Sequence, residues 1–94
     1  MPSVHNLPVD ERAEMIARLK RIEGQAKGIQ KMIEEGRDCV DVMNQLTAVK
    51  AAVNGLGAEM LETFALHCLR HPEDFASPEQ AIEQAVRALV RSGR

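Results

Sequence analysis

The chain has 94 residues, the length of one small domain, which excludes a two-domain protein. Apolar residues make up 45% of it but aromatic residues only 2%, so a core must be built from aliphatic side chains and methionine, as is typical of packed helices. Twelve Lys and Arg residues against fourteen Asp and Glu residues give a formal net charge of -2. This balance excludes a uniformly basic nucleic-acid-binding protein but permits a local basic face.

The sequence gives no indication of membrane insertion or of catalysis. No apolar run approaches the roughly 18 residues that a bilayer span requires, and residues 1–12 contain no hydrophobic signal core. We therefore expect a soluble, cytoplasmic protein whose two cysteines are thiols rather than a structural disulfide. No acid–base constellation or cofactor motif is present, so we expect no enzymatic activity.

The first predicted helix covers residues 10–35. Residues 1–9 are expected to form a flexible N-terminal arm, and residues 10–94 a single domain. Apolar residues of the helix follow alternating steps of four and three, the spacing of a helix that packs against another helix. They are Met15, Leu19, Ile22, Ala26, Ile29 and Ile33. Gly36 suits the left-handed position that ends such a helix.

The second predicted helix runs from Cys39 to about Arg70, with Asp38 as its N-cap. The same apolar spacing continues along it, through Val42, Leu46, Val49, Val53, Leu56 and Met60. Gly55 and Gly57 either weaken this helix or mark a close crossing with another helix.

A shorter third helix is predicted from Pro78 to about Gly93. Pro72 ends the second helix, and Ser77 then supplies an N-cap with Gln80 as its capping-box partner. The residues expected to point inward are Ile82, Ala85, Val86 and Leu89.

The length of the second helix predicts self-association. About 32 residues at about 1.5 Å each make a helix roughly 48 Å long, which one small chain cannot cover. Its apolar seam, with the small residues Ala51, Ala52, Gly55 and Gly57, calls for a partner. We expect an obligate homo-oligomer in which this helix lies antiparallel to its own copy.

The two cysteines stand at opposite ends of the second predicted helix. Cys39 and Cys68 are 29 residues apart, roughly 43 Å along the axis, so they cannot meet within one chain. Antiparallel pairing would bring Cys39 of one chain to Cys68 of the other. The helix N-terminus favours a thiolate at Cys39, whereas Cys68 suits a resolving thiol. Two alternatives remain open: both cysteines are packing residues, or the helix folds back at Gly55 and Gly57 and joins them in a disulfide.

The first helix is the electropositive element. From Arg12 to Lys31, six basic residues exceed the two acidic ones by four charges. Arg18, Arg21 and Gln25 are spaced by three and four, so they form one stripe that suits contacts with DNA phosphates. A solvated helix face is the ordinary explanation of such a stripe.

The sequence resembles the CsoR/RcnR family of bacterial repressors. The resemblance is carried by RLKRIEGQ at residues 18–25, by KMIEEGRDCVDVMNQLTAVK at residues 31–50 and by the position of Cys68, and it extends to Arg91. It implies an all-α three-helix protomer, an antiparallel dimer, a flat dimer-of-dimers tetramer, and operator binding that an inducer at the inter-subunit cysteines abolishes. The implied DNA-binding residues are Arg18, Lys20, Arg21, Gln25 and Lys50. Gly55 stands where the copper-sensing branch has a basic residue, for which Lys50, Arg87 or Arg91 is expected to compensate.

The resemblance also bears on the inducer. Copper-sensing members have a His one helical turn before the second Cys, where this chain has Phe64, whose ring has no lone pair for a metal. They also have Tyr where this chain has Asp38, and Glu where it has Gln84. Cys39 and Cys68 without that His resemble the persulfide-sensing CstR branch. The implied inducer is a sulfane sulfur donor, which joins the two thiols as a di-, tri- or tetrasulfide without a metal.

Three alternative functions remain open. The first is a Cu(I)-responsive repressor that binds the ion through Cys39, Cys68 and His71, with a role for His67 left open. The second is a formaldehyde-responsive repressor that uses Pro2 and Cys39. The third is a helical dimerisation module that binds no DNA.

Overall fold

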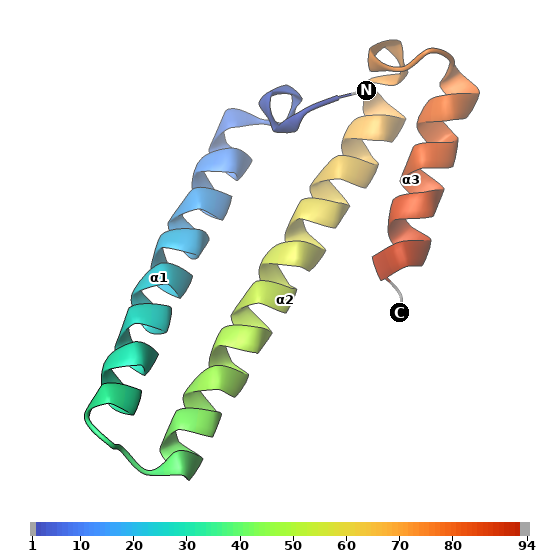
Figure 1. Cartoon of the computed structure of the whole chain (residues 1–94). Coiled ribbons are helices and arrows are strands. Elements are labelled where there is room, and N and C mark those ends of the chain that lie inside the picture. The colour runs from blue at the N-terminus through green and yellow to red at the C-terminus, as the bar shows by residue number, and fades with distance from the viewer. Residues whose placement is uncertain (1, 93–94) are drawn as a thin grey trace.

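The computed structural model describes residues 2–92, and three α-helices account for most of them (Figure 1). These are α1 (Val9–Glu34), α2 (Cys39–Arg70) and α3 (Pro78–Ser92), with the 3-10 turns η1 (Val4–Asn6) and η2 (Pro72–Asp74). No strand occurs within residues 2–92, which confirms the all-α prediction. None of the helices in this range combines the length and the apolar character needed to cross a membrane.

The helix α2 lies between the other two helices. Its N-terminal part packs beside α1, while α3 turns back along its C-terminal part (Figure 1). The described chain measures 55 × 27 × 15 Å with a radius of gyration of 17.4 Å, whereas about 12 Å is expected for a compact domain of this length. The protomer is therefore an open, elongated layer of helices.

The turn between α1 and α2 uses the residues that the sequence predicts. Gly36 has φ 71°, the left-handed conformation that ends α1. The Asp38 side chain accepts a hydrogen bond of 2.8 Å from the backbone N–H of Val40, so it caps α2. These local signals fix both helix ends within a few residues of chain.

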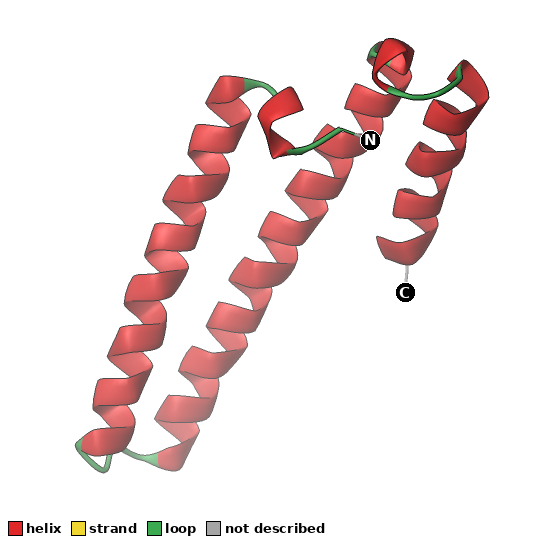
Figure 2. Cartoon of the chain, turned by 45° about the horizontal axis from the view of Figure 1, so that its top comes forward, coloured by secondary structure: helices red, strands yellow, loops and turns green. Residues whose placement is uncertain are grey.

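The start of α3 follows the prediction with one difference. Ser77 Oγ accepts a hydrogen bond from the backbone N–H of Gln80, as a cap should. The Gln80 side chain, however, accepts from the backbone N–H of Ala76 at 2.8 Å, one residue before the capping position. Both bonds tie the connection from α2 to the first turn of α3, and Figure 2 shows this connection running from the end of α2 to the start of α3.

The segment before α1 has its own local structure. Ser3 and Asn6 form a reciprocal capping box around η1, and Leu7 is only 4% exposed. The helix α1 begins at Val9, one residue before the predicted start, directly after Pro8. The flexibility of residues 1–9 stays a prediction, while Leu7 belongs to the buried set.

The buried core is small. Its apolar members are Leu7, Met15, Ile29, Ala65, Cys68, Ala81 and Ala85. In α1 and α2 alternate members of the predicted seam behave differently. One set, spaced by seven residues, is buried or half-buried, namely Met15, Ile22, Ile29, Val42, Val49 and Leu56, while the other set is exposed, namely Leu19, Ala26, Ile33, Leu46, Val53 and Met60. The chain alone therefore covers about one side of its own apolar seam.

The predicted inward face of α3 is wrong in three of its four residues. Ala81 and Ala85 are 1% and 2% exposed and face α2, whereas Ile82, Val86 and Leu89 are each more than half exposed. Alanine methyl groups allow α3 to approach α2 closely, and the larger side chains one position further around the helix then face away. The strongest apolar face of α3 is thus left uncovered by this chain.

Candidate functional site

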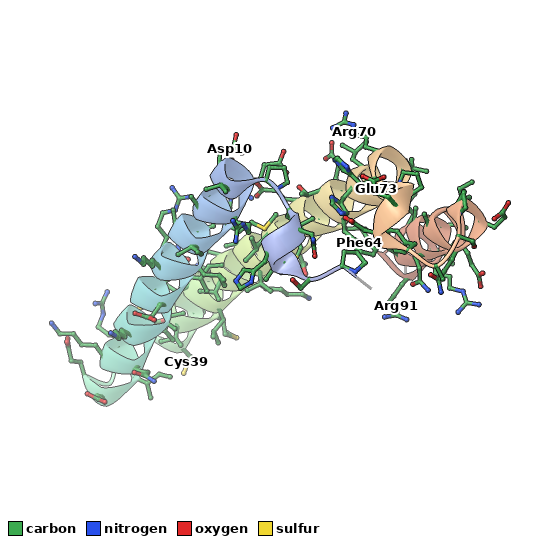
Figure 3. The ribbon with its side chains drawn as sticks, turned by 90° about the horizontal axis from the view of Figure 1, so that it is seen from above. Asp10, Cys39, Phe64, Arg70, Glu73 and Arg91 are labelled. Carbon is green, nitrogen blue, oxygen red and sulfur yellow. The ribbon has the colours of Figure 1, made fainter. Side chains whose placement is uncertain are left out.

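The two cysteines lie at opposite ends of one continuous helix. The helix α2 runs unbroken through Gly55 and Gly57, which rules out the fold-back disulfide and leaves Cys39 and Cys68 as free thiols. Their 29-residue separation corresponds to roughly 43 Å along the helix. Figure 3 shows Cys39 at the far end of the molecule from Phe64, which lies one helical turn before Cys68. Any joint chemistry of these thiols requires two chains.

Cys39 is the first residue of α2 and is exposed. The acidic residues Asp38 and Asp41 flank it, and the Asp38 side chain accepts from the backbone N–H of Val40. Its exposure makes Cys39 the thiol that a dissolved reagent reaches first.

Cys68 has the opposite environment. It is 0% exposed and lies in a cluster with Ala65 of α2 and Ala85 of α3, against which Phe64 and Phe75 pack. Burial raises the pKa of the Cys68 thiol, and a smaller backbone hydrogen-bond effect lowers it. The thiol is therefore held protonated and shielded under α3 and the turn that precedes it.

Two histidine–carboxylate pairs surround the end of α2. His67 is 7% exposed and donates from Nε2 to Asp74 Oδ2 at 2.7 Å, which ties the helix to η2. His71 is exposed, and its Nδ1 lies 3.0 Å from Glu73 Oε1. A backbone hydrogen bond and then the bond from His71 lower the pKa of the Glu73 carboxyl. The imidazole rings of His67 and His71 are 4.8 Å apart between centroids.

The side chains near Cys68 can be compared with the ligands that a metal site needs. Within residues 2–92 of one chain, no three His, Cys, Asp or Glu side chains are grouped as a metal site. Phe64 occupies the position one turn before Cys68, and the His67 Nε2 is already bonded to Asp74. Soft thiolates suit Cu(I), so Cys68 and His71 fit the ion only if Cys39 of a second chain completes the set.

Pro2 lies at the Cys68 end of the molecule. It lines an apolar cavity of about 350 Å³ together with Ser3, Val4, Leu7, Gly57, Met60, Leu61 and Phe64. This cavity extends along α2 as far as Phe64, one helical turn before Cys68.

Three of the predicted DNA-binding residues share one surface. Arg18, Arg21 and Gln25 line a cavity of about 250 Å³ between α1 and α2, which Ile22 and Ala52 complete. The other two, Lys20 and Lys50, are exposed but do not line it. The helical spacing thus predicted the grouping of the first three residues.

Sequence reasoning missed an acidic partner of Arg18. Arg18 Nη1 lies 3.2 Å from Glu59 Oε2 on α2. The same nitrogen lies 3.8 Å from the place where a Cβ on Gly55 would be, so the guanidinium reaches across α2 beside this glycine. Gly55 stands four residues before Glu59, a spacing that puts both on one helix face, but the charge pattern of α1 alone did not point to Glu59.

Known proteins resemble the chain over nearly its full length. Residues 11–91 match a family described as metal-sensitive transcriptional repressor. The copper-sensing transcriptional repressor CsoR of Bacillus subtilis (strain 168) is 43% identical over 74 residues, 79% of this chain and 73% of that protein. The copper-sensing transcriptional repressor RicR of Mycobacterium tuberculosis is 42% identical over 76 residues, 79% of each protein.

A solved structure agrees with the fold. The copper-sensing repressor CsoR with Cu(I) from Geobacillus thermodenitrificans NG80-2 is 33% identical, with a TM-score of 0.75 over 100% of this chain and 94% of that chain. The matched family is made up of all-helical transcriptional repressors rather than enzymes. The chain belongs to the CsoR/RcnR family of metal-sensitive transcriptional repressors.

Proposed function

We propose that the chain is a repressor that binds operator DNA through α1 and releases it when Cys39 and Cys68 of neighbouring chains react. Family membership supports the repressor role. The cavity lined by Arg18, Arg21 and Gln25 supports α1 as the DNA contact, because guanidinium and amide groups on one surface suit phosphate and base edges.

The proposed assembly follows from the uncovered half of the apolar seam. The exposed residues Leu46, Val53 and Met60 recur every seven residues along α2, and a second α2 laid antiparallel would cover them. This pairing places Cys39 of one protomer at Cys68 of its partner, twice in each dimer. The exposed face of α3 offers a further surface on which two dimers form the proposed tetramer.

We propose a sulfane sulfur donor as the inducer. Phe64 carries this choice, because the position one helical turn before Cys68 offers no third ligand to a metal. A Cys39 thiolate takes the outer sulfur of a persulfide RSSH, giving Cys39–S–SH and RS⁻. Cys68 of the partner then displaces this terminal sulfur, leaving a disulfide and H₂S. If Cys68 of the partner has first taken a sulfur from a second RSSH, its persulfide attacks the inner sulfur of Cys39–S–SH and displaces HS⁻, which leaves a trisulfide; one more such transfer gives the tetrasulfide.

The bridge would change the shape of the assembly. A covalent link at each end of the paired α2 helices favours one arrangement of the dimer over others. Because Cys68 is buried in the protomer, bridging also requires α3, and Phe75 in the turn before it, to move from above the thiol. Both effects bias the assembly away from the arrangement that binds DNA.

Cu(I) is the second candidate, and the copper-sensing relatives favour it. Cys39 of one chain, with Cys68 and His71 of the other, would hold the ion. The two thiolates and the imidazole would be the ligands, and Cu(I) would link the two chains by coordination in place of a sulfur bridge. Formaldehyde is a third candidate because Pro2 lies in one cavity with Phe64, at the end where Cys39 of a partner would arrive.

One experiment separates these inducers. Binding to the DNA upstream of the chain's own gene is measured by gel shift and anisotropy, anaerobically, with glutathione persulfide, Cu(I) or formaldehyde. Intact-mass analysis without reductant follows each sample. We expect persulfide to give sulfur-bridged dimers and to release DNA, and Cys39→Ser to abolish both effects. A tight stoichiometric Cu(I) complex that releases DNA, without a persulfide response, contradicts the sulfur inducer. Absence of salt-sensitive operator binding contradicts the repressor itself and supports the dimerisation module.

Phe64 provides a matched pair of variants. Phe64→His restores a nitrogen ligand one turn before Cys68 and should create or strengthen a Cu(I) response, whereas Phe64→Leu keeps the position apolar and should not. If the unmodified chain already responds to Cu(I) as strongly as Phe64→His, the argument from Phe64 is wrong.

A further inference from the structure

We propose that Glu59 is a positioning residue that holds the guanidinium of Arg18 in place for operator phosphates. The inference rests on the proposed DNA binding through α1 and assigns a role to a residue of α2 that does not touch DNA. In physical terms, an acidic side chain next to a DNA-binding arginine strengthens specific binding.

The contact joins two helices. Arg18 Nη1 of α1 lies 3.2 Å from Glu59 Oε2 of α2, with the two side chains 38% and 22% exposed. The Oε2 atom is inaccessible to solvent and accepts no hydrogen bond within residues 2–92, so its approach to Arg18 is an ion contact without hydrogen-bond alignment. A shielded carboxylate oxygen needs a cation, and Arg18 is its cation among the described residues.

The surroundings fix where the guanidinium lies. Gly55 leaves the surface of α2 open, with Arg18 Nη1 3.8 Å from the place of a missing Cβ. The same Arg18 lines the cavity that it shares with Arg21 and Gln25. A guanidinium has five N–H donors in a rigid fork, so one contact to Glu59 leaves donors for a phosphate. Holding this fork in advance reduces the rotamer entropy that DNA binding would otherwise cost.

Charge and positioning predict opposite results when the acid is removed. Glu59 carries the same sign as DNA, so its long-range field alone weakens binding, and neutralising it should strengthen binding. If Glu59 positions Arg18, neutralising it should weaken binding to the operator while binding to unrelated DNA stays equal or rises. The sign of the change therefore decides between the two effects.

The experiment compares three variants of the full-length protein. Glu59→Gln removes the charge with little change of size, and Glu59→Asp keeps the charge but shortens the reach. Glu23→Gln is the control, because Glu23 is 70% exposed, lies on α1 and pairs with Lys27 only at 3.7 Å. Operator and unrelated DNA are titrated by anisotropy over a range of salt, and circular dichroism checks that each variant is folded.

We expect both Glu59 variants to bind the operator about three- to tenfold more weakly, as for the removal of a partly shielded ion pair. The slope of log affinity against log salt should fall by about one for each phosphate that the variant no longer neutralises. Glu23→Gln should bind equally or more tightly. Arg18→Ala should weaken binding, and adding Glu59→Gln to it should weaken it no further, because the two changes remove one function.

Three outcomes overturn the inference. Operator binding by Glu59→Gln that matches or exceeds the unmodified chain, as in Glu23→Gln, shows that only charge matters. Unchanged binding by Glu59→Asp shows that reach is irrelevant. Additive effects of Arg18→Ala and Glu59→Gln show that the two residues act separately. An unmodified chain without operator binding refutes the proposed function itself, a result distinct from these three.

Discussion

Replacing Asp74 by Ala tests whether the bond from His67 holds the cover over Cys68. The bond is 2.7 Å long and its His67 side chain is 6% exposed, so the variant leaves a buried ring nitrogen without its acceptor. Such a loss costs about 1–3 kcal/mol. Asp74 is 31% exposed, so water replaces part of the bond, and we expect a loss at the lower end, about 1 kcal/mol.

Thermal unfolding and thiol alkylation should both report the stability that Asp74→Ala loses. Thermal unfolding at fixed protein concentration should show a midpoint lower by about 4–8 °C for each kcal/mol. In a Cys39→Ser background, Cys68 is the single thiol, and its alkylation in the folded state reports opening of η2 and α3. If the bond restrains this opening, a loss of about 1 kcal/mol should speed alkylation about fivefold.

The neighbouring pair supplies the control. Glu73 and His71 form the same kind of contact at 3.0 Å, but both side chains are more than half exposed. Glu73→Ala should change stability by less than about 0.5 kcal/mol and leave alkylation unchanged. Asp74→Asn keeps an acceptor for His67 and should therefore retain much of the stability and the slow alkylation that Asp74→Ala loses. If Asp74→Ala and Glu73→Ala behave alike in both assays, the bond from His67 does not restrain the cover.

Three further predictions follow from single residues. An alkylating reagent should modify exposed Cys39 well before buried Cys68, as tryptic mass mapping over time would show; equal rates would contradict the burial of Cys68. Because burial raises the pKa of Cys68, the unfolded chain loses this proton first as pH rises. Stability should therefore be complete below the ordinary thiol pKa and fall above it, and Cys68→Ala should flatten that fall in denaturant titrations at several pH values. Gly28→Ala, where an added Cβ meets nothing within 4 Å, should stabilise α1 by up to about 1 kcal/mol. Gly36→Ala, at φ 71°, should lower the free energy of unfolding by about 1–2 kcal/mol. If calorimetry showed that both variants change the stability in the same direction, the backbone argument would be refuted.

Local sequence signals predicted the helices and their ends well. Gly36 and Asp38 act within a few residues of themselves, through a left-handed backbone and a side-chain cap, so no distant contact was needed to place the turn. The continuity of α2 through Gly55 and Gly57 could not be decided in this way. Each glycine costs about 1 kcal/mol in a helix, and packing by α1 and α3 along α2 outweighs that cost.

The orientation of α3 shows what periodicity leaves open. The apolar spacing of Ile82, Val86 and Leu89 correctly indicates one face of an amphipathic helix, but periodicity cannot tell which neighbour covers that face. In this chain the face toward α2 is made by Ala81 and Ala85. The proposed partner chain would cover this stripe, and exposed apolar area of this kind costs about 25 cal/mol per Å² while it faces water.

Arg18 shows the corresponding limit for charge. The spacing of three and four grouped Arg18 with Arg21 and Gln25, and the structure brings these three to one cavity. This spacing could not include Glu59, which is 41 residues further along the chain than Arg18 and reaches it only because α2 folds back beside α1. A basic stripe on one helix therefore predicts a surface, whereas an ion pair such as Arg18–Glu59 depends on which acidic residues the neighbouring helix places beside it. Arg21 is exposed and forms no salt bridge within residues 2–92. If Arg21 contacts a phosphate, the Arg21→Ala variant should bind the operator more weakly, and by the same factor with or without a change at Glu59.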